Sequence, residues 1–302
     1  MQNYPNYYHP VAGRQPSRHR GRSKLRKFAV FLLAVFVLGL GTHVALARAA
    51  DARKQAEQQR IAAETSARKQ RVAALDAQMQ SVFAQYPNIT FSVSLIDLHD
   101  NSLKHLGSDQ EFTAASTAKM ITAADFLHEV ELGQQSLSKI IDGETAQQLL
   151  QKMIVESDND AWADLNDTLT HTSLKNYAAT QIGFTDYDPD NNTLSANDMA
   201  LLLQKLYEGK LLHQSDTSLL LDYMKQANYR QFTVPAVPSQ DTIYHKIGVL
   251  DDLVHDATII THGNDAFVMA IYTDGNGDYS WDTRAAAMQA ITKLAIKAYL
   301  NN

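Results

Sequence analysis

The stretch "FTAASTAKMITAADFL", residues 112–127, places Ser116 three residues before Lys119, where an apolar, alanine-rich helix is predicted to begin. Residues i and i+3 share one face of a helix, so the Lys119 amine can reach the Ser116 hydroxyl from one turn away. The same S-x-x-K pattern occurs at Ser66–Lys69 and at Ser136–Lys139. Spacing alone therefore does not single out one pair, and the rest of the chain has to distinguish them.

Composition indicates a folded protein with an uneven charge distribution. The chain has 302 residues, of which 45% are hydrophobic and 20% charged, values typical of one large or two modest domains. Residues 1–27 hold seven Arg or Lys and no acid, which leaves an acidic body. The absence of cysteine excludes disulfides, thiol catalysis and cysteine metal sites. The histidines lack a metal-ligand spacing such as H-E-x-x-H, so we expect no metal site and no cofactor.

Residues 28–47, "FAVFLLAVFVLGLGTHVALA", carry no formal charge and are long enough to cross a hydrocarbon layer of ~30 Å as a helix. A basic cluster precedes them, so the positive-inside rule places the N-terminus in the cytoplasm and the later chain outside. A cleaved signal peptide is the alternative, because Ala45-Leu46-Ala47 has a small-x-small form. The length of the apolar run and of the basic tail favours an uncleaved anchor. We predict a single-pass protein of the cell membrane.

The segments on either side of this anchor are predicted to lack a packed core. Residues 1–27 are predicted to be a disordered cytoplasmic tail, whose basic side chains suit anionic lipid headgroups better than nucleic acid. Residues 48–86 are rich in Ala, Gln, Arg, Lys and Glu, which favours a long solvated helix. We interpret it as a stalk with a weak coiled-coil seam and weak self-association. Ser66 and Lys69 on this stalk are predicted to be a solvated face.

From residue 87 onward the pattern changes to that of a mixed α+β domain, residues 87–302. The alternating run "ITFSVSLIDL", residues 89–98, predicts a strand, followed by a second short strand and then the helix near Ser116. Ser195 and Asp198 form a capping-box pattern at the start of another helix. The order of elements predicts an antiparallel sheet with a helical middle segment. Helices are predicted at 143–155, 159–169, 172–182, 195–209, 215–227 and 282–300, and late strands at 242–249, 256–263 and 265–273.

Two more short motifs follow "STAK" along the chain, and their order is informative. "SDN" at 157–159 lies between two predicted helices, and "HKIG" at 245–248 lies on the first late strand. This trio resembles the S-x-x-K, S-D-N and K-T-G boxes of class A β-lactamases and penicillin-binding serine acyltransferases, over about residues 88–302. The resemblance implies a β-lactamase/transpeptidase-like fold, with about five antiparallel strands and helices on both faces. It also implies a serine hydrolase that passes through an acyl-enzyme.

The catalytic roles implied by the resemblance agree with the chemistry of the side chains. Ser116 would be the nucleophile and Lys119 the base, which requires a partly neutral amine. A second cation nearby would depress the Lys119 pKa, and Lys246 is the candidate. Ser157 would pass a proton to the leaving nitrogen. Asp158 is predicted to be a structural hydrogen-bonding residue.

The remaining matched positions are predicted to bind substrate. The Asn159 amide would orient the amide of the substrate, and Gly248 would let substrate lie close to the strand edge. The backbone N–H groups of Ser116 and Val249 would form the oxyanion hole. His245 is predicted either to line the cleft or to face solvent, and Ser136 with Lys139 to be part of a polar connector.

Two departures from the family pattern bear on turnover. Ile247 stands where the family has a hydroxyl residue that helps to bind the substrate carboxylate. No glutamate occurs between Glu156 and Glu208, although class A β-lactamases use an Ω-loop glutamate to activate the deacylating water. The loop at 183–195 offers Asp186, Asp188 and Asp190, whose side chains are shorter, and we predict that these acids form turns.

Three functions remain open on the sequence alone. The first is a membrane-anchored serine hydrolase that opens a β-lactam or related amide, with slow deacylation. The second is a penicillin-binding D-alanyl carboxypeptidase or endopeptidase that acts on peptidoglycan peptides. The third is a non-hydrolytic cell-wall-binding or sensor module. The five matched side chains favour the two enzymes, whereas Ile247 and the missing glutamate favour the third function.

Overall fold

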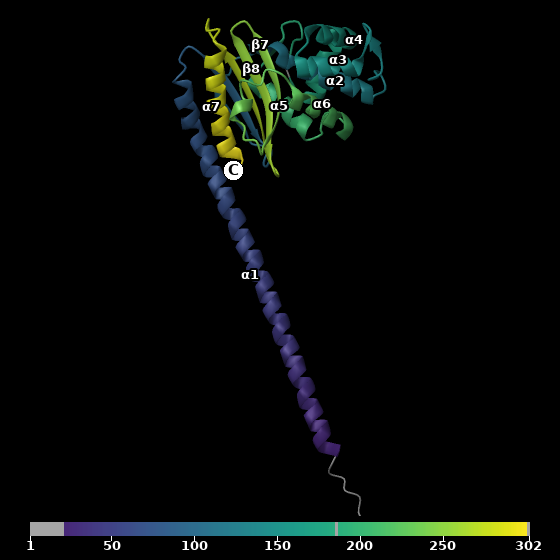
Figure 1. Ribbon diagram of the computed structural model, residues 1–302, viewed down its shortest axis with the longest axis vertical. Helices are drawn as coiled ribbons and strands as arrows, with labels where there is room; N and C mark the ends of the chain where they lie inside the picture. The colour runs from purple at the N-terminus through teal and green to yellow at the C-terminus, as the bar shows by residue number, and fades with distance from the viewer. Residues whose placement is uncertain (1–20, 185–186, 301–302) are drawn as a thin grey trace, which may run out of the picture. The chain divides into compact units, whose positions relative to one another are not determined.

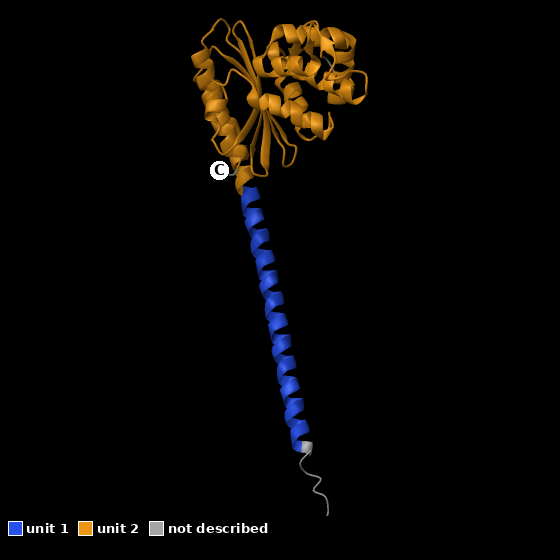
Figure 2. Cartoon of the chain, turned by 45° about the vertical axis from the view of Figure 1, so that its right-hand side comes forward, with its two compact units in different colours: residues 1–66 blue, residues 67–302 orange. Residues whose placement is uncertain are grey.

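The chain forms two compact units, residues 1–66 and 67–302 (Figure 2). A computed structural model describes residues 21–184 and 187–300 (Figure 1). Helix α1, Gly21–Phe83, begins in the first unit and is long and apolar enough to cross a membrane, a property that a signal sequence also has. Residues 21–27, predicted to be disordered, are helical, because Arg, Lys and Leu there extend the apolar helix. The prediction for residues 1–20 lies outside the described residues.

The last turns of α1 belong to the second unit and not to a free stalk. Leu75 and Met79 are fully buried and Val82 nearly so. Their i, i+4, i+7 spacing places them on one helix face, which packs on the core of the same chain. The last three apolar residues of the seam interpreted as a weak coiled coil are therefore buried within the molecule. The compact unit begins twenty residues before the boundary expected at residue 87.

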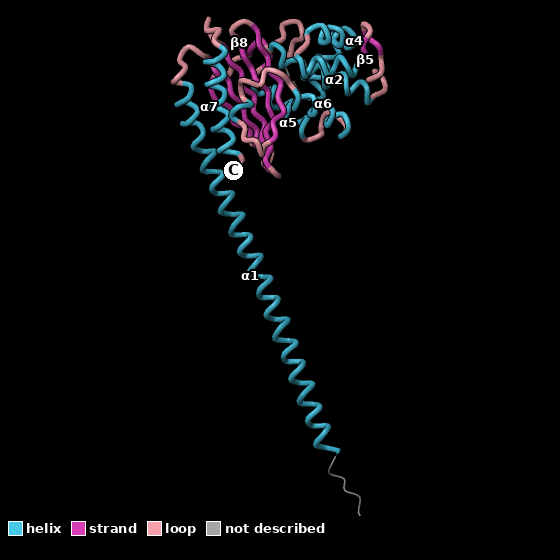
Figure 3. The backbone as a smooth tube through the Cα atoms, in the orientation of Figure 1, coloured by secondary structure: helices cyan, strands magenta, loops and turns pink. Residues whose placement is uncertain are grey.

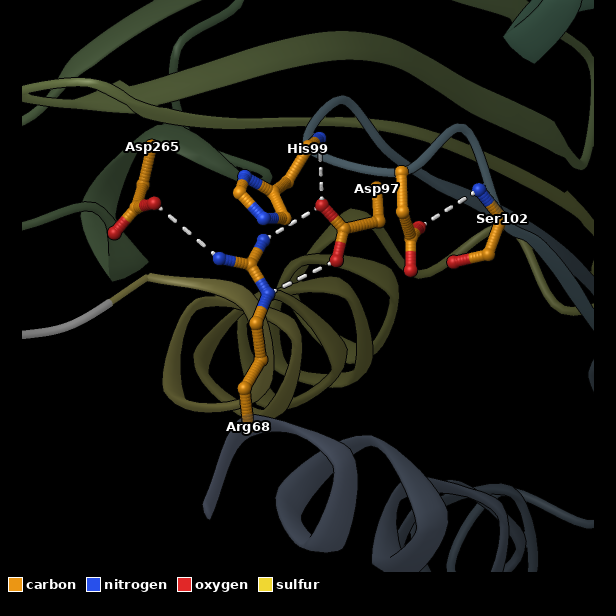
Figure 4. Close-up of polar contacts among 6 residues, drawn as sticks. Arg68, Asp97, His99, Ser102 and Asp265 are labelled. Atoms are coloured by element: carbon orange, nitrogen blue, oxygen red, sulfur yellow. Dashed lines mark hydrogen bonds and ion pairs between the residues drawn. The ribbon is translucent and has the colours of Figure 1, made fainter. Parts of the chain in front are cut away.

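An ion-pair cluster attaches the same helix to the sheet. The Arg68 guanidinium donates from Nε and Nη2 to the two carboxylate oxygens of Asp97, at 2.9 and 2.6 Å. Its Nη1 donates to Asp265 at 3.2 Å (Figure 4). Only 13% of the Arg68 side chain and 5% of that of Asp97 are exposed, so solvent screens this bidentate pair weakly.

The domain is organised around one antiparallel sheet of five strands in the order β2-β1-β9-β8-β7. The predicted α+β class and the five-strand sheet are confirmed (Figure 3). Strand β8 begins three residues earlier than predicted. It pairs with β9 along its whole length and with β7 from Leu253 to Thr261. The strands are β1 Thr90–Asp97, β2 Leu103–Gly107, β7 Thr242–Leu250, β8 Leu253–His262 and β9 Asp265–Asp274.

Helices cover both faces of this sheet, as predicted. Helix α7 and the end of α1 lie on one face, and α2 to α6 lie on the other (Figure 1). The capping box of Ser195 and Asp198 is present at the start of α5. The helices are α2 Lys119–Glu131, α3 Ala146–Gln151, α4 Asn159–Tyr177, α5 Ala196–Tyr207, α6 Gln214–Gln226 and α7 Trp281–Tyr299.

Several short elements complete the fold. The two helices predicted at 159–169 and 172–182 are separated as predicted, because α4 consists of two helical stretches divided by a kink at the non-helical Thr170 (φ 63°, ψ 148°). A π-helical turn, η3, follows the second stretch. The hydroxyl of Thr170 accepts from the backbone N–H of Ser173, a local bond that competes with the helical pattern. The remaining elements are β3 Phe112–Thr113, β4 Ile140–Ile141, β5 Glu144–Thr145, β6 Thr193–Leu194, η1 Ala115–Ala118, η2 Lys152–Glu156, η3 Ala178–Ile182 and η4 Val234–Ala236.

Candidate active site

Ser116 lies in the short 3₁₀ turn η1 that leads directly into α2. It is partly exposed, whereas its neighbours Ala115 and Thr117 are buried. Ala115 has a left-handed backbone (φ 48°), a conformation that costs free energy for a residue other than glycine. Surrounding contacts must hold such a turn in place. The tight turn therefore exposes the Ser116 side chain at the N-terminus of α2.

A buried hydrogen-bond and aromatic network holds this turn from below. The Thr117 hydroxyl lies 2.6 Å from the carbonyl oxygen of Ala114, to which it donates, and 2.7 Å from the Tyr272 hydroxyl. The His255 ring stacks on that of Tyr272 at 4.2 Å, and its Nε2 lies 2.9 Å from the Thr113 carbonyl oxygen. Burial lowers the pKa of His255 to about 4, so its ring is neutral at pH 7. Sequence reasoning missed this network, because no local pattern connects these residues.

Lys119 is fully buried beneath the nucleophile turn, in the first turn of α2. Its Nζ donates to the Ser157 carbonyl oxygen and to Asn159 Oδ1, each at 2.7 Å. The ammonium also lies over the Trp162 ring, 5.2 Å from the centroid. The structure thus brings the first two boxes into direct contact. Trp162 was not predicted, although it follows the "SDN" box by three residues on the same helix.

Ser157 connects the two lysines. It has a left-handed backbone (φ 62°) at the end of η2, which turns its carbonyl oxygen to Lys119. Its hydroxyl accepts from Lys246 Nζ at 2.8 Å and lies 3.4 Å from Lys119 Nζ. Asp158 caps α4 by accepting from the Ala161 N–H, as its predicted structural role requires. All three boxes therefore meet at one serine hydroxyl.

Burial weakens the basicity of both lysines. Desolvation lowers the pKa of Lys119 to about 8, and the charge of Asp158 opposes part of this shift. Desolvation also lowers the pKa of Lys246 to about 7, with a further contribution from repulsion by Lys119 and an opposing one from Asp256. We expected Lys246 to depress the pKa of Lys119, but removal from water is the main cause for both amines. Each amine is thus partly neutral near pH 7 to 8.

Gly248 allows β7 to pass directly against the nucleophile turn. A Cβ at this position would lie 2.8 Å from the Ala114 carbonyl oxygen and 3.1 Å from the Thr117 nitrogen, closer than side chains tolerate. The glycine is therefore required for packing of strand on turn, in addition to any contact with substrate. The same approach brings the strand that carries Val249 beside Ser116.

Ile247 does not face the same way as its neighbours. Adjacent residues of a strand project to opposite faces of the sheet. Ile247 is 2% exposed and packs in the core on the α7 face, together with Phe232. An apolar side chain suits that position, where a hydroxyl would need a buried partner. His245 shares this face and is fully buried, so both predictions for it, a cleft residue or a solvent-facing one, are wrong.

Comparison with known proteins places this geometry in a family. Residues 74–300 match the Beta-lactamase enzyme family. The chain belongs to that family. PBP-A has 23% sequence identity and a TM-score of 0.67, and the match covers 74% of this chain and 95% of PBP-A. The ancestral class A β-lactamase GNCA has 19% identity and a TM-score of 0.68, with 74% of this chain and 100% of that chain covered.

One of the matching structures is described as an acyl-enzyme. A PBP-A mutant described as an acyl-enzyme complex with penicillin G has 23% identity and a TM-score of 0.68, over 75% of this chain and 96% of that one. At these identities the structural likeness shows the fold alone. No curated protein matches the sequence.

The loop at 183–195 is the segment that would hold a deacylating base in a β-lactamase. The side-chain amide of Asn192 in this loop contacts the nucleophile turn. Asn192 Nδ2 donates to the Ala115 carbonyl oxygen at 3.3 Å, and its backbone carbonyl accepts from Ala114 N–H at 2.8 Å. The buried Asn192 Oδ1 has no partner among the described residues. An amide binds water but does not remove a proton from it at neutral pH. Asn192 was not predicted, and its place three residues before "SAND" was the only sequence signal.

The aspartates weighed as substitutes have other partners. Asp188 accepts from the backbone N–H of Asp190 and from the side chain of Asn191, which holds the turn together. Asp190 is 73% exposed and pairs with His171. The predicted turn-forming roles of both residues agree with these contacts. Asp186 lies outside the described residues.

The other two S-x-x-K matches form no comparable site. Ser66 and Lys69 are exposed on α1. The Ser136 hydroxyl contacts Ser138, and Lys139 donates to Gln135, all on the connector after α2. Of the three pairs, only Ser116 with Lys119 contacts the other boxes.

Proposed function

We propose that this protein is a membrane-anchored, extracytoplasmic serine hydrolase that opens a β-lactam or a related amide through an acyl-Ser116 intermediate and deacylates slowly. The observation that carries the proposal is that Lys246 and Lys119, which follows Ser116 by one helical turn, both lie within hydrogen-bond distance of the Ser157 hydroxyl. The apolar segment of α1 and the basic residues before it support the anchor.

The acylation step uses the two weakened bases and one relay. The neutral amine of Lys119 accepts the Ser116 proton as the serine oxygen attacks the carbonyl carbon. The backbone N–H groups of Ser116 and Val249 stabilise the negative charge on the carbonyl oxygen. Ser157 donates its proton to the leaving nitrogen as the C–N bond breaks, and the Lys119 ammonium returns the proton taken from Ser116 to the Ser157 oxygen. Lys246 keeps its charge and attracts a substrate carboxylate. Asn159 orients the amide of the substrate.

Among the described residues, none is placed as an evident base for release of the acyl group. Asn192 takes the place next to Ala115, and Asp188 and Asp190 are engaged in the turn and with His171. Slow release also suits a penicillin-binding carboxypeptidase or endopeptidase that acts on peptidoglycan peptides. This second function is therefore favoured by the same observation. The two functions differ in which acyl group leaves Ser116 faster, that of a natural peptide or that of a β-lactam.

A covalent-labelling experiment tests the proposal. The full-length chain in detergent is incubated with a fluorescent penicillin and, separately, with a chromogenic cephalosporin. We expect one label per chain on Ser116 that persists for minutes or longer, with little colour beyond one equivalent. Ser116→Ala should abolish the label, and Ser136→Ala, in the unconnected S-x-x-K pair, should retain it.

Two outcomes would change this assignment. Rapid, continuous colour would show that an efficient deacylating base exists. The absence of any label in the unaltered protein would exclude both hydrolase functions and leave the wall-binding module.

A further inference from the structure

Two exposed aromatic side chains, Tyr229 and Trp281, form what we call the aromatic shelf. Their ring centroids are 6.2 Å apart and their planes are inclined at 70°, an edge-to-face pair. Each residue is 42% exposed. Trp281 also leans on the buried ring of Phe232 at 5.8 Å, which supports it from the core side. The shelf is therefore a supported apolar surface that retains free ring area.

The backbone of Tyr229 is strained. Its φ of 59° lies in the left-handed region, which a bulky side chain rarely adopts. Such a conformation persists where surrounding contacts impose it, and these outliers cluster at sites of function. The two preceding residues supply contacts of that kind. Asn228 N–H donates to the Val155 carbonyl oxygen at 2.8 Å, and the Ala227 carbonyl oxygen lies 3.2 Å from His245 Nε2.

These two contacts connect the Tyr229 side of the shelf to chain neighbours of two site residues. Val155 lies two residues before Ser157, and His245 is adjacent to Lys246. Ser157 and Lys246 are themselves in hydrogen-bond contact at 2.8 Å. The loop that carries Tyr229 is thus attached to the immediate neighbours of both residues.

The Trp281 side is connected to β7, at the C-terminal end of that strand. The loop before α7 is held by Asp252, whose backbone oxygen accepts from Gly275 N–H at 3.0 Å and whose carboxylate accepts from Gly277 N–H at 2.6 Å. Asp252 lies in the turn directly after β7, the strand of Gly248 and Val249. Both halves of the shelf are therefore positioned by elements that carry site residues.

We propose that the aromatic shelf binds a planar ring on the leaving-group half of the substrate and so determines specificity. The proposal rests on the proposed function, because the roles given to Ser157 and Lys246 define which half of the substrate lies on their side. Aromatic rings pair in offset or edge-to-face arrangements at 4.5–7 Å, and the exposed parts of Tyr229 and Trp281 offer that geometry. The chemical class of ligand is an amide or lactam whose amine portion carries an aryl or similar flat group.

The test compares two cephalosporins with the same acyl side chain. One carries an arylvinyl group on the dihydrothiazine ring and the other carries a methyl group there. We expect the full-length protein to acylate faster with the aryl compound, measured as kcat/KM by mass spectrometry. Trp281→Ala and Tyr229→Gly should each reduce this preference by about two- to tenfold, the range of one aromatic pair. Rates with the methyl compound should stay within about twofold.

The variants separate recognition from folding. Glycine accepts the φ of Tyr229 without strain, so Tyr229→Gly should keep the melting temperature while losing the ring. Leu132→Ala, which truncates an exposed apolar side chain at the end of α2, is the matched control and should leave the preference unchanged. An unchanged preference in both shelf variants would overturn the proposal, as would equal losses with both substrates.

A binding measurement keeps the proposal testable if acylation itself is absent. In Ser116→Ala, the aryl compound should change tryptophan fluorescence more than the methyl compound does. This difference should vanish when Trp281→Phe is added, although Trp162 remains. Acylation by the methyl compound with no aryl preference would refute the shelf and leave the proposed function intact. Failure of acylation combined with the expected fluorescence change would refute the proposed function and leave the binding role of the shelf intact.

Discussion

At the scale of the residue, the pKa values of the two buried lysines determine when the site can work. Lys119 acts as a base only when neutral, and its fraction of neutral amine rises as pH passes its pKa of about 8. Lys246 attracts a carboxylate only when charged, and its charge is lost as pH passes about 7. We therefore expect the acylation rate with a carboxylate-bearing β-lactam to peak between pH 7 and pH 8. Stopped-flow labelling from pH 5.5 to 9.5 measures this profile.

A substrate without a carboxylate provides the control for this profile. An uncharged activated ester or thioester should show the rise through about pH 8 and no decline at higher pH, because it does not need the Lys246 charge. A rate that is flat or that falls between pH 6 and pH 8 with both substrates would contradict the role of Lys119 as base.

At the scale of the element, the contact between β7 and the turn η1 sets the position of the nucleophile. Gly248→Ala would place a methyl group 2.8 Å from the Ala114 carbonyl oxygen. Overpacking of this kind costs about 1–3 kcal/mol of stability, and the turn moves to relieve it. We expect a lower unfolding midpoint in urea and an acylation rate at least about tenfold lower, since small displacements of a reacting group have large effects. Gly41→Ala, where nothing lies within 4 Å, should change neither measurement.

At the scale of the whole molecule, the end of α1 is part of the folded domain. Full burial of an apolar side chain contributes about 1.5–3 kcal/mol, so Leu75, Met79 and Val82 together contribute about 5–9 kcal/mol. That is comparable with the total stability of a typical domain, about 5–15 kcal/mol. We expect a fragment of residues 60–302 to unfold cooperatively and to accept the penicillin label. A fragment of residues 87–302 should aggregate or unfold at much lower urea concentration.

Arg68 offers a finer test at the same scale. Arg68→Met in the longer fragment keeps most of the helix packing but leaves the buried Asp97 without its bidentate partner. We expect the free energy of unfolding to fall by roughly 2 kcal/mol or more, because an unpaired buried carboxylate is costly. Equal stability of the fragments that start at residues 60 and 87 would show that α1 is a stalk up to residue 86.

Local patterns predicted most of the elements because strands and helices leave periodic signals in the chain. The alternating run at 89–98 became β1, and the capping pattern of Ser195 and Asp198 became the start of α5. The kink at Thr170 falls in the gap between the helices predicted at 159–169 and 172–182, because each stretch carries its own helical spacing. Leu75, Met79 and Val82 showed an apolar face, but the spacing does not say whether a partner helix or the sheet of the same chain covers it.

The sequence by itself determined the family, through three short boxes in order, and the side chains that do the proposed chemistry at Ser116, Lys119, Ser157 and Lys246. Local spacing suffices there, because each box is a turn or strand with its own pattern. The tertiary structure decided how these groups behave. Burial between distant elements lowers the two lysine pKa values, and strand packing turns Ile247 into the core. Contacts among segments far apart in the chain place Asn192 by the nucleophile turn and Tyr229 beside Trp281. Local sequence patterns do not predict such contacts.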